Sequence, residues 1–162
     1  MSRQAAMFHR PSQTGRSYWG PADAYTFLVT GEESGGKYFA MEAIVPPGGG
    51  PPPHIHTLED ETFYLLEGEC TFRLGDEVVS AGPRDFVNVP RGQVHNFLNA
   101  STSLLRMIIT FTPSGIEKFF EETLELCLDP TATPPDNIDE VNARYAEAAP
   151  RYGMEFLVLS NA

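Results

Sequence analysis

Short runs of apolar residues, separated by turn residues, fill the middle of the chain. Between residues 25 and 112, Gly, Pro and Asp residues interrupt these runs at close, regular spacing. Many short strands spaced in this way indicate an all-β sandwich or barrel. The predicted strands are Tyr25–Thr30, Lys37–Val45, Thr62–Leu66, Cys70–Leu74, Val78–Ser80, Phe86–Val89, Asn96–Leu98 and Leu104–Thr112. A turn is predicted between the first two, at residues 31–36.

The pattern changes to a helical one after residue 112. Ser114-Gly115-Ile116-Glu117 has the Ser-x-x-Glu form of a capping box, which predicts the start of a helix. Glu117 and its acidic neighbours are expected on the solvent face of this helix. Its apolar face is expected to consist of Ile116, Phe119, Phe120 and Leu124.

A second C-terminal helix is predicted from Asp136, as the capping residue, to a point before Pro150. Ile138, Val141 and Tyr145 would form its apolar stripe. The chain thus divides into an N-terminal arm at residues 1–24, a β-barrel at 25–112 and a helical extension at 113–162. A length of 162 residues suits one domain with a sizeable core.

Charge and cysteine content exclude several classes of function. The formal net charge is −11, from 22 acidic and 11 basic residues, and such a surface repels nucleic acids and anionic membranes. No apolar run approaches the length of a membrane span, and residues 1–15 lack the apolar core of a secretory signal. Cys70 and Cys127 lie far apart and indicate no disulfide framework, which favours a reducing cytoplasm.

Three of the four histidines gather in two short segments that read as one metal site. His54 and His56 are two residues apart, so on an extended strand both rings point to the same face. Glu61 opens the next apolar run, and His95 lies on a later strand. Three nitrogen donors and one oxygen suit a first-row divalent metal that keeps open positions for a substrate or O2. His9, in the polar arm, is not predicted to be a ligand.

These two segments resemble the two sequence motifs of the cupin family. The first, Gly-x5-His-x-His-x4-Glu-x6-Gly, is matched by Gly48, His54, His56, Glu61 and Gly68. The second, Pro-x-Gly-x2-His-x3-Asn, is matched by Pro90, Gly92, His95 and Asn99. Arg84 stands where the family usually opens the second motif with glycine. The resemblance covers about residues 25–112 and implies a small jelly-roll barrel, also called a double-stranded β-helix, with His54, His56, Glu61 and His95 as metal ligands inside it.

Within that family, the chain resembles bacterial single-cupin quercetin 2,3-dioxygenases. The matching segments are residues 30–32, 51–56, 60–69 and 111–115, the last leading into Phe119-Phe120-Glu121. The resemblance implies oxidative opening of a flavonol heterocycle with release of carbon monoxide. It also implies a small aromatic substrate, O2, and one divalent transition metal: iron, manganese, nickel, cobalt, copper or zinc.

Roles can be assigned to three further positions. Glu61 is the candidate catalytic base for the flavonol hydroxyl. Phe63 has the same strand parity as Glu61, and Phe97 the same as His95, so both are candidates for an apolar wall of the substrate pocket. The alternative is that they only fill the core of a small barrel.

Other functions fit the same residues. A non-oxidative isomerase, cyclase or lyase would use the four ligands without O2, and a non-enzymatic small-molecule sensor or store would use them for binding alone. A metal-free sugar isomerase is disfavoured by the full ligand set. The open edges of a single barrel and the arm residues Tyr18 and Trp19 favour a homodimer.

Overall fold

Strand β10 (Leu105–Thr112) shows how the apolar pattern builds a sheet in the computed structural model, which describes residues 4–157. Its residues alternate between buried and more exposed positions, because one face packs on the core and the other faces outward. It pairs antiparallel with β3 (Phe39–Val45) on one side and with β5 (Asp60–Glu67) on the other. These three long strands form the centre of the larger sheet.

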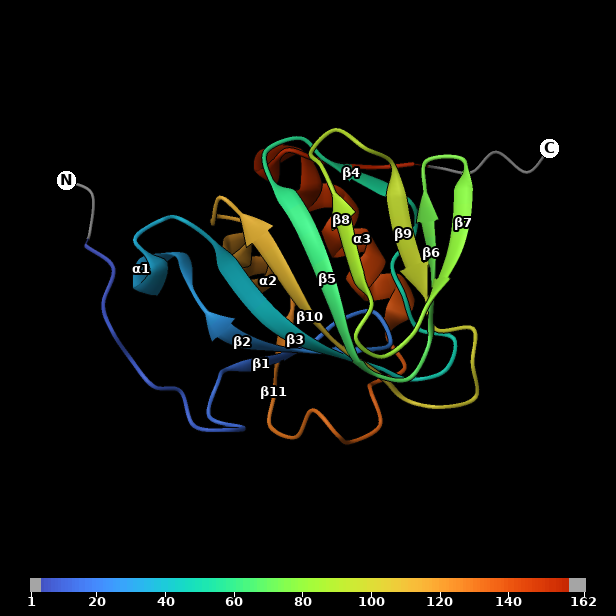
Figure 1. Ribbon diagram of the computed structural model, residues 1–162, viewed down its shortest axis with the longest axis horizontal. Coiled ribbons are helices and arrows are strands. Elements are labelled where there is room, and N and C mark those ends of the chain that lie inside the picture. The colour runs from blue at the N-terminus through green and yellow to red at the C-terminus, as the bar shows by residue number, and fades with distance from the viewer. Residues whose placement is uncertain (1–3, 158–162) are drawn as a thin grey trace.

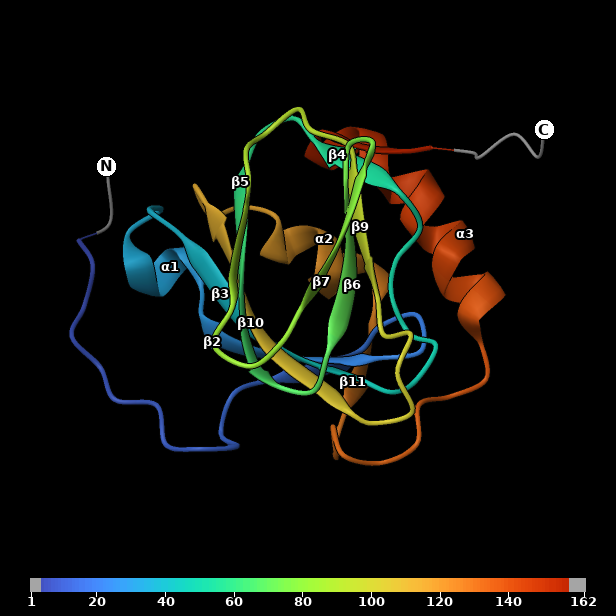
Figure 2. The same ribbon diagram turned by 45° about the vertical axis from the view of Figure 1, so that its right-hand side comes forward.

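The strands form two antiparallel sheets that face each other (Figures 1 and 2). The larger has seven strands in the order β11-β1-β2-β3-β10-β5-β8, and the smaller has five in the order β12-β4-β9-β6-β7. The other strands of the larger sheet are β1 (Ser17–Trp19), β2 (Ala24–Val29), β8 (Phe86–Val89) and β11 (Glu125–Cys127). The smaller sheet consists of β4 (His54–His56), β6 (Cys70–Leu74), β7 (Glu77–Ala81), β9 (His95–Leu98) and β12 (Met154–Phe156). The predicted jelly-roll barrel is confirmed.

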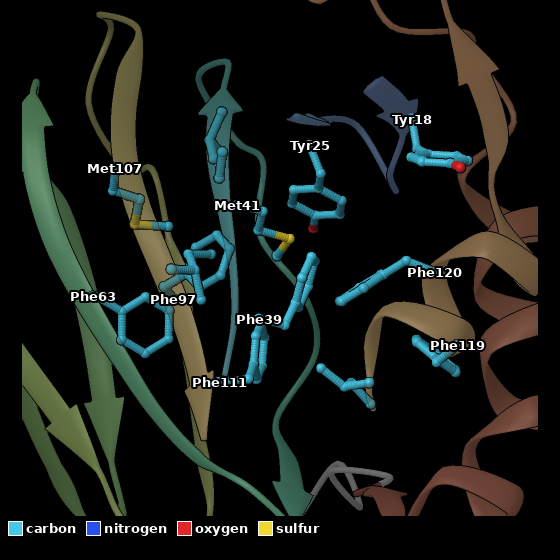
Figure 3. Close-up of a cluster of buried hydrophobic side chains, with 14 of the residues drawn as sticks. Tyr18, Tyr25, Phe39, Met41, Phe63, Phe97, Met107, Phe111, Phe119 and Phe120 are labelled. Carbon is cyan, nitrogen blue, oxygen red and sulfur yellow. The ribbon is translucent and has the colours of Figure 1, made fainter. Parts of the chain in front are cut away.

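Aromatic rings fill the space between the sheets. Phe63 of β5 packs against Phe72 of β6 and Phe97 of β9, with ring centroids 5.0 and 5.9 Å apart. Towards the C-terminal helices, Phe39 and Phe111 stack at 5.7 Å (Figure 3). This ring-rich core joins strands of both sheets, so it holds the barrel walls in register with each other.

The segment predicted as a turn at residues 31–36 contains a short helix, α1 (Gly31–Ser34). Its capping box is formed by Thr30 and Glu33: the Thr30 hydroxyl accepts from the Glu33 amide, and the Glu33 carboxylate accepts from the Thr30 amide. Gly35 ends the helix in the left-handed conformation. The capping box therefore occurs in this chain, but not at the position the sequence suggested.

The predicted capping box at Ser114 is wrong. Helix α2 (Glu117–Thr123) starts only at Glu117, and Ile116 precedes it without a side-chain cap. The solvent-facing placement of Glu117 is also wrong, because this residue is 4 % exposed. Its two carboxylate oxygens accept hydrogen bonds from the amides of Gly31 at 2.8 Å and Gly115 at 2.7 Å. These bonds offset the cost of burying the charge and tie the start of α2 to the start of α1.

Helix α3 (Ile138–Ala148) follows the linker and ends before Pro150, as predicted. Asp136 is not its cap; Asn137 occupies that position and makes no side-chain capping bond. A 3-10 turn, η1 (Ala149–Tyr152), leads into β12. Figure 2 shows α3 running along one side of the sheets. Within residues 4–157, no helix is both long and apolar enough to cross a bilayer.

The segments outside the predicted barrel also add strands to both sheets. Strand β1, from the N-terminal arm, pairs with β2, and β11, which follows α2, pairs with β1 and extends that edge further. From the C-terminal side, β12 pairs with β4, placing Met154 opposite His56 and Phe156 opposite His54. The C-terminal segment is therefore bonded directly to the strand that carries two of the predicted ligands.

Arg84, the departure from the family motif, keeps the backbone that a glycine would have. Its φ is 75°, in the left-handed region that favours glycine. Its amide still donates to the Leu65 carbonyl at 2.9 Å, so the turn is preserved. The motif glycine Gly68 could not be replaced by a larger residue in the same way. Its φ is 80°, and a Cβ there would lie 2.3 Å from the Leu104 carbonyl oxygen.

Candidate metal centre

Three strands bring the four predicted ligands together. His54 and His56 lie on β4 and are both buried, whereas Ile55 between them is partly exposed, as the strand parity predicted. His95 lies opposite His54 on β9, and Glu61 comes from β5 of the other sheet. All four side chains are buried, and their potential ligand atoms lie within 4.8 Å of one another. His9, by contrast, is exposed.

Backbone carbonyls fix the orientation of two of the imidazoles. Nδ1 of His54 lies 2.9 Å from the Pro52 carbonyl oxygen, and Nδ1 of His95 lies 3.0 Å from that of Gln93. A carbonyl only accepts, so each Nδ1 carries a proton and each Nε2 is turned to the centre of the cluster. There, His95 Nε2 is 2.7 Å from Glu61 Oε2. In the metal-free protein these two groups share a proton. A metal cation bound by both groups would take the place of that proton.

The electrostatics of the cluster also suit a cation. Burial, with the neighbouring His95 and His56, lowers the pKa of His54 to about 3, so this ring stays neutral and keeps its lone pair. Burial opposes ionisation of Glu61, but attraction to His56 and the hydrogen bond from His95 prevail and lower its pKa. Burial likewise opposes protonation of His95, yet its hydrogen bond to Glu61 raises its pKa. Nitrogen donors with one carboxylate could hold iron, manganese, cobalt, nickel, copper or zinc.

A second carboxylate, Glu59, lies behind His56 and was missed from the sequence. Its Oε2 is 3.6 Å from His56 Nδ1, and both side chains are buried. Neither of these two atoms has a hydrogen-bond partner among the described residues. A carboxylate behind a ligating histidine is a recurrent way of orienting the ring and raising its basicity. The available signal was an acid three residues after a ligand, in the turn between β4 and β5.

We expect Glu59→Gln to weaken metal binding by about 10- to 100-fold, the usual loss when such a partner is changed. The metal-free protein should be at least as stable as wild type, because a buried charged group with one oxygen that lacks a donor is replaced by a neutral amide. Chelator competition measures the first effect, and thermal unfolding in excess chelator measures the second. Glu69→Gln, at an exposed turn position, is the control. Unchanged metal affinity with lower metal-free stability would give Glu59 a structural role instead.

A small cavity adjoins the ligands. His54, His56 and Glu61 form one wall, and its other side chains are Tyr25, Met41, Pro51, Phe97, Ile109, Phe111, Phe119, Phe120, Tyr145, Met154 and Phe156. Its volume is about 30 Å³, which is room for about two water molecules. Most of its lining is aromatic or aliphatic, so the candidate metal faces an apolar space.

The C-terminal part of the chain covers this cavity. Phe119 and Phe120 project from α2 (Figure 3), Tyr145 comes from α3, and Met154 and Phe156 come from β12. The sequence did not show whether this segment would cap the barrel or pack elsewhere. Because these side chains line the cavity, the C-terminal segment closes the end of the barrel at which the ligands lie.

The two phenylalanines predicted for the pocket lie at different depths. Phe97 lines the cavity beside the ligands. Phe63 is buried behind it, where its ring contacts those of Phe72 and Phe97. Phe97 is therefore positioned to meet a ligand, and Phe63 is positioned to support Phe97.

Comparison with known proteins agrees with this geometry. The family described as "Cupin domain" matches residues 41–111, the stretch that contains all four candidate ligands. Residues 41–111 form a cupin domain. Among solved structures, the chain resembles a predicted oxalate decarboxylase from Thermotoga maritima, with a TM-score of 0.61 and 21 % identity over 66 % of this chain and 99 % of that one. It also resembles the polyketide cyclase RemF from Streptomyces resistomycificus, with a TM-score of 0.58 and 22 % identity over 66 % and 80 % of the two chains.

A curated relative carries a more specific similarity. The chain is 28 % identical over 96 residues to quercetin 2,3-dioxygenase from Bacillus subtilis (strain 168). This match covers 59 % of the chain but only 28 % of the relative, so the chain spans less than a third of that protein. The structural similarities establish the fold, and the activity has to be argued from the site.

Proposed function

We propose that this cupin binds one divalent transition metal through His54, His56, Glu61 and His95 and opens a flavonol, or a related enolisable aromatic compound, with O2. The observation that carries the proposal is the buried cluster of three histidines and one glutamate facing an apolar, ring-lined cavity. The similarity to quercetin 2,3-dioxygenase favours a flavonol as the substrate.

Glu61 would be the base of this reaction. A bound metal would act as a Lewis acid towards the enolic oxygen of the substrate and make its hydroxyl more acidic. Glu61 is buried and its pKa is lowered, so its carboxylate is ionised and can accept a proton. The carboxylate oxygen that the metal leaves free would take the proton of the substrate hydroxyl.

The cavity walls would hold the flat substrate and keep water out. Phe97, Phe111 and Phe120 offer ring faces and edges to an aromatic ligand. Pockets for ligands of this size usually measure about 300 Å³ or more, well above the 30 Å³ of this cavity. Substrate entry therefore requires that the side chains of the C-terminal cover, such as Phe119 and Phe120, move apart.

The decisive experiment is to add quercetin to protein loaded in turn with each candidate metal, and to follow oxygen uptake and carbon monoxide release. Metal-dependent oxygen consumption with carbon monoxide as a product is the expected result, and it would also identify the working metal. Consumption of an enolisable substrate under strict anaerobiosis would favour a non-oxidative isomerase, cyclase or lyase. Tight metal binding without any reaction of quercetin would remove the flavonol from the proposal.

A further inference from the structure

Two tyrosines give the cavity a second polar end, in addition to the candidate ligands. Apart from those ligands, Tyr25 of β2 and Tyr145 of α3 are the only polar side chains among the described residues that line it. Both are 4 % exposed, so neither hydroxyl is satisfied by bulk solvent. An apolar cavity with a few fixed polar groups is the usual form of a specific small-molecule site.

The hydrogen bonding of this polar end is incomplete. The Tyr25 hydroxyl donates to Asp23 Oδ2 at 2.8 Å, and Asp23 is fully buried. Asp23 Oδ1 has no hydrogen-bond partner in the described part of the chain. The Tyr145 hydroxyl lies beside that of Tyr25 and interacts with it, but no bond of good geometry joins the two. Buried polar atoms are nearly always paired, so two atoms without a well-formed bond beside one cavity require an explanation.

These groups are held in place by their surroundings. The Tyr145 ring packs against Phe119 at 4.7 Å and lies nearly parallel to Phe156 at 5.9 Å. On the other side, a Cβ at Gly20 would lie 2.1 Å from Asp23 Oδ1 and 2.6 Å from the Tyr25 ring, so only glycine leaves room for this pair. Figure 3 shows the Tyr25 hydroxyl directed inward, towards Met41. These contacts place both hydroxyls at the wall of the cavity.

We propose that Tyr25 and Tyr145, with Asp23 behind them, form a polar subsite that binds a second oxygen of the substrate, other than the oxygen at the metal. The Tyr25 hydroxyl donates its proton to Asp23, so its oxygen can still accept. The Tyr145 O–H has only this poorly aligned neighbour, and a substrate oxygen of better geometry can replace it. A substrate hydroxyl can pair with both groups, and a carbonyl can pair with Tyr145. The proposal rests on the proposed function and narrows it to aromatic substrates with a second hydroxyl or carbonyl group.

The test is a comparison of two flavonols on the zinc-loaded protein without O2, with binding measured by calorimetry. Quercetin carries hydroxyls beyond the metal-binding oxygen pair, and 3-hydroxyflavone carries none. We expect wild type to prefer quercetin by about tenfold, the contribution of one or two hydrogen bonds. Tyr145→Phe should remove most of this preference by weakening quercetin alone. Tyr18→Phe, at a buried tyrosine outside the cavity, should leave it intact.

The subsite proposal would be overturned if Tyr145→Phe still preferred quercetin, or if it lost the same factor in affinity for both flavonols. If wild type binds neither flavonol, the flavonol proposal fails, and thermal unfolding of the ligand-free protein decides on the subsite. A hydroxyl that awaits a ligand has no well-aligned internal partner, so Tyr145→Phe should unfold at the same or a higher temperature than wild type. A clearly lower temperature would show that the hydroxyl is already satisfied within the fold, and the subsite would be rejected.

Discussion

Replacing His56 with alanine is expected to abolish both metal binding and turnover. His56 supplies one of four candidate donor atoms, and without it Glu59 becomes a buried carboxylate that faces no ring. Metal content after desalting should fall from about one ion per chain to background, a loss of affinity of at least about 100-fold for a missing ligand. His9→Ala, at the exposed histidine of the arm, is the matched control.

Circular dichroism of the metal-free His56→Ala protein would show whether the barrel is intact. A folded variant with full metal occupancy would remove His56 from the ligand set. If a folded variant binds metal weakly but still turns over substrate when metal is in excess, His56 contributes to metal affinity and is not required for the reaction.

Glu61→Gln is expected to keep part of the metal and lose most of the turnover. The amide keeps the shape of the side chain and one oxygen donor, but it cannot accept the substrate proton. Loss of a general base typically lowers the rate by about 10²- to 10⁴-fold. Turnover should be expressed per bound metal ion, so that the loss of a base is separated from the loss of a ligand.

Asp60→Asn is the control for Glu61→Gln, because the neighbouring Asp60 carboxylate is half exposed and bonded to Arg91 at 3.0 Å. It should leave turnover per metal ion near the wild-type value. Unchanged turnover in Glu61→Gln would mean that the substrate loses its proton elsewhere, and the role of Glu61 would be limited to the donor set.

Only part of the candidate ligand set has local geometry. Strand parity places His54 and His56 on one face, whereas Glu61 and His95 come from other strands and were assigned through the resemblance to the two cupin motifs. Parity also predicted that Phe63 would be buried. It could not predict that Phe97 lines the cavity and Phe63 lies behind it, since that depends on how the two sheets are stacked.

Features that depend on distant contacts were missed. Tyr25 and Tyr145 are far apart in sequence and meet only because α3 folds back onto the barrel. In the sequence, Glu117 resembles the other acidic residues expected on the surface. It is buried because its carboxylate accepts a hydrogen bond from the distant Gly31 amide, and no local sequence pattern reveals that contact. The strands β11 and β12 are three residues long and have too little sequence to show a period.

The residues that cover the cavity and those that hold the candidate metal belong to different stretches of the chain. The residues of the cover, from Phe119 to Phe156, all follow the cupin domain in the sequence. Every candidate ligand lies inside the cupin domain. Substitutions in the cover can change the size and polarity of the cavity while the donor atoms stay in place. Selection, natural or in the laboratory, can therefore exchange the substrate without rebuilding the metal centre, and libraries confined to residues 116–156 are the economical way to look for new specificities.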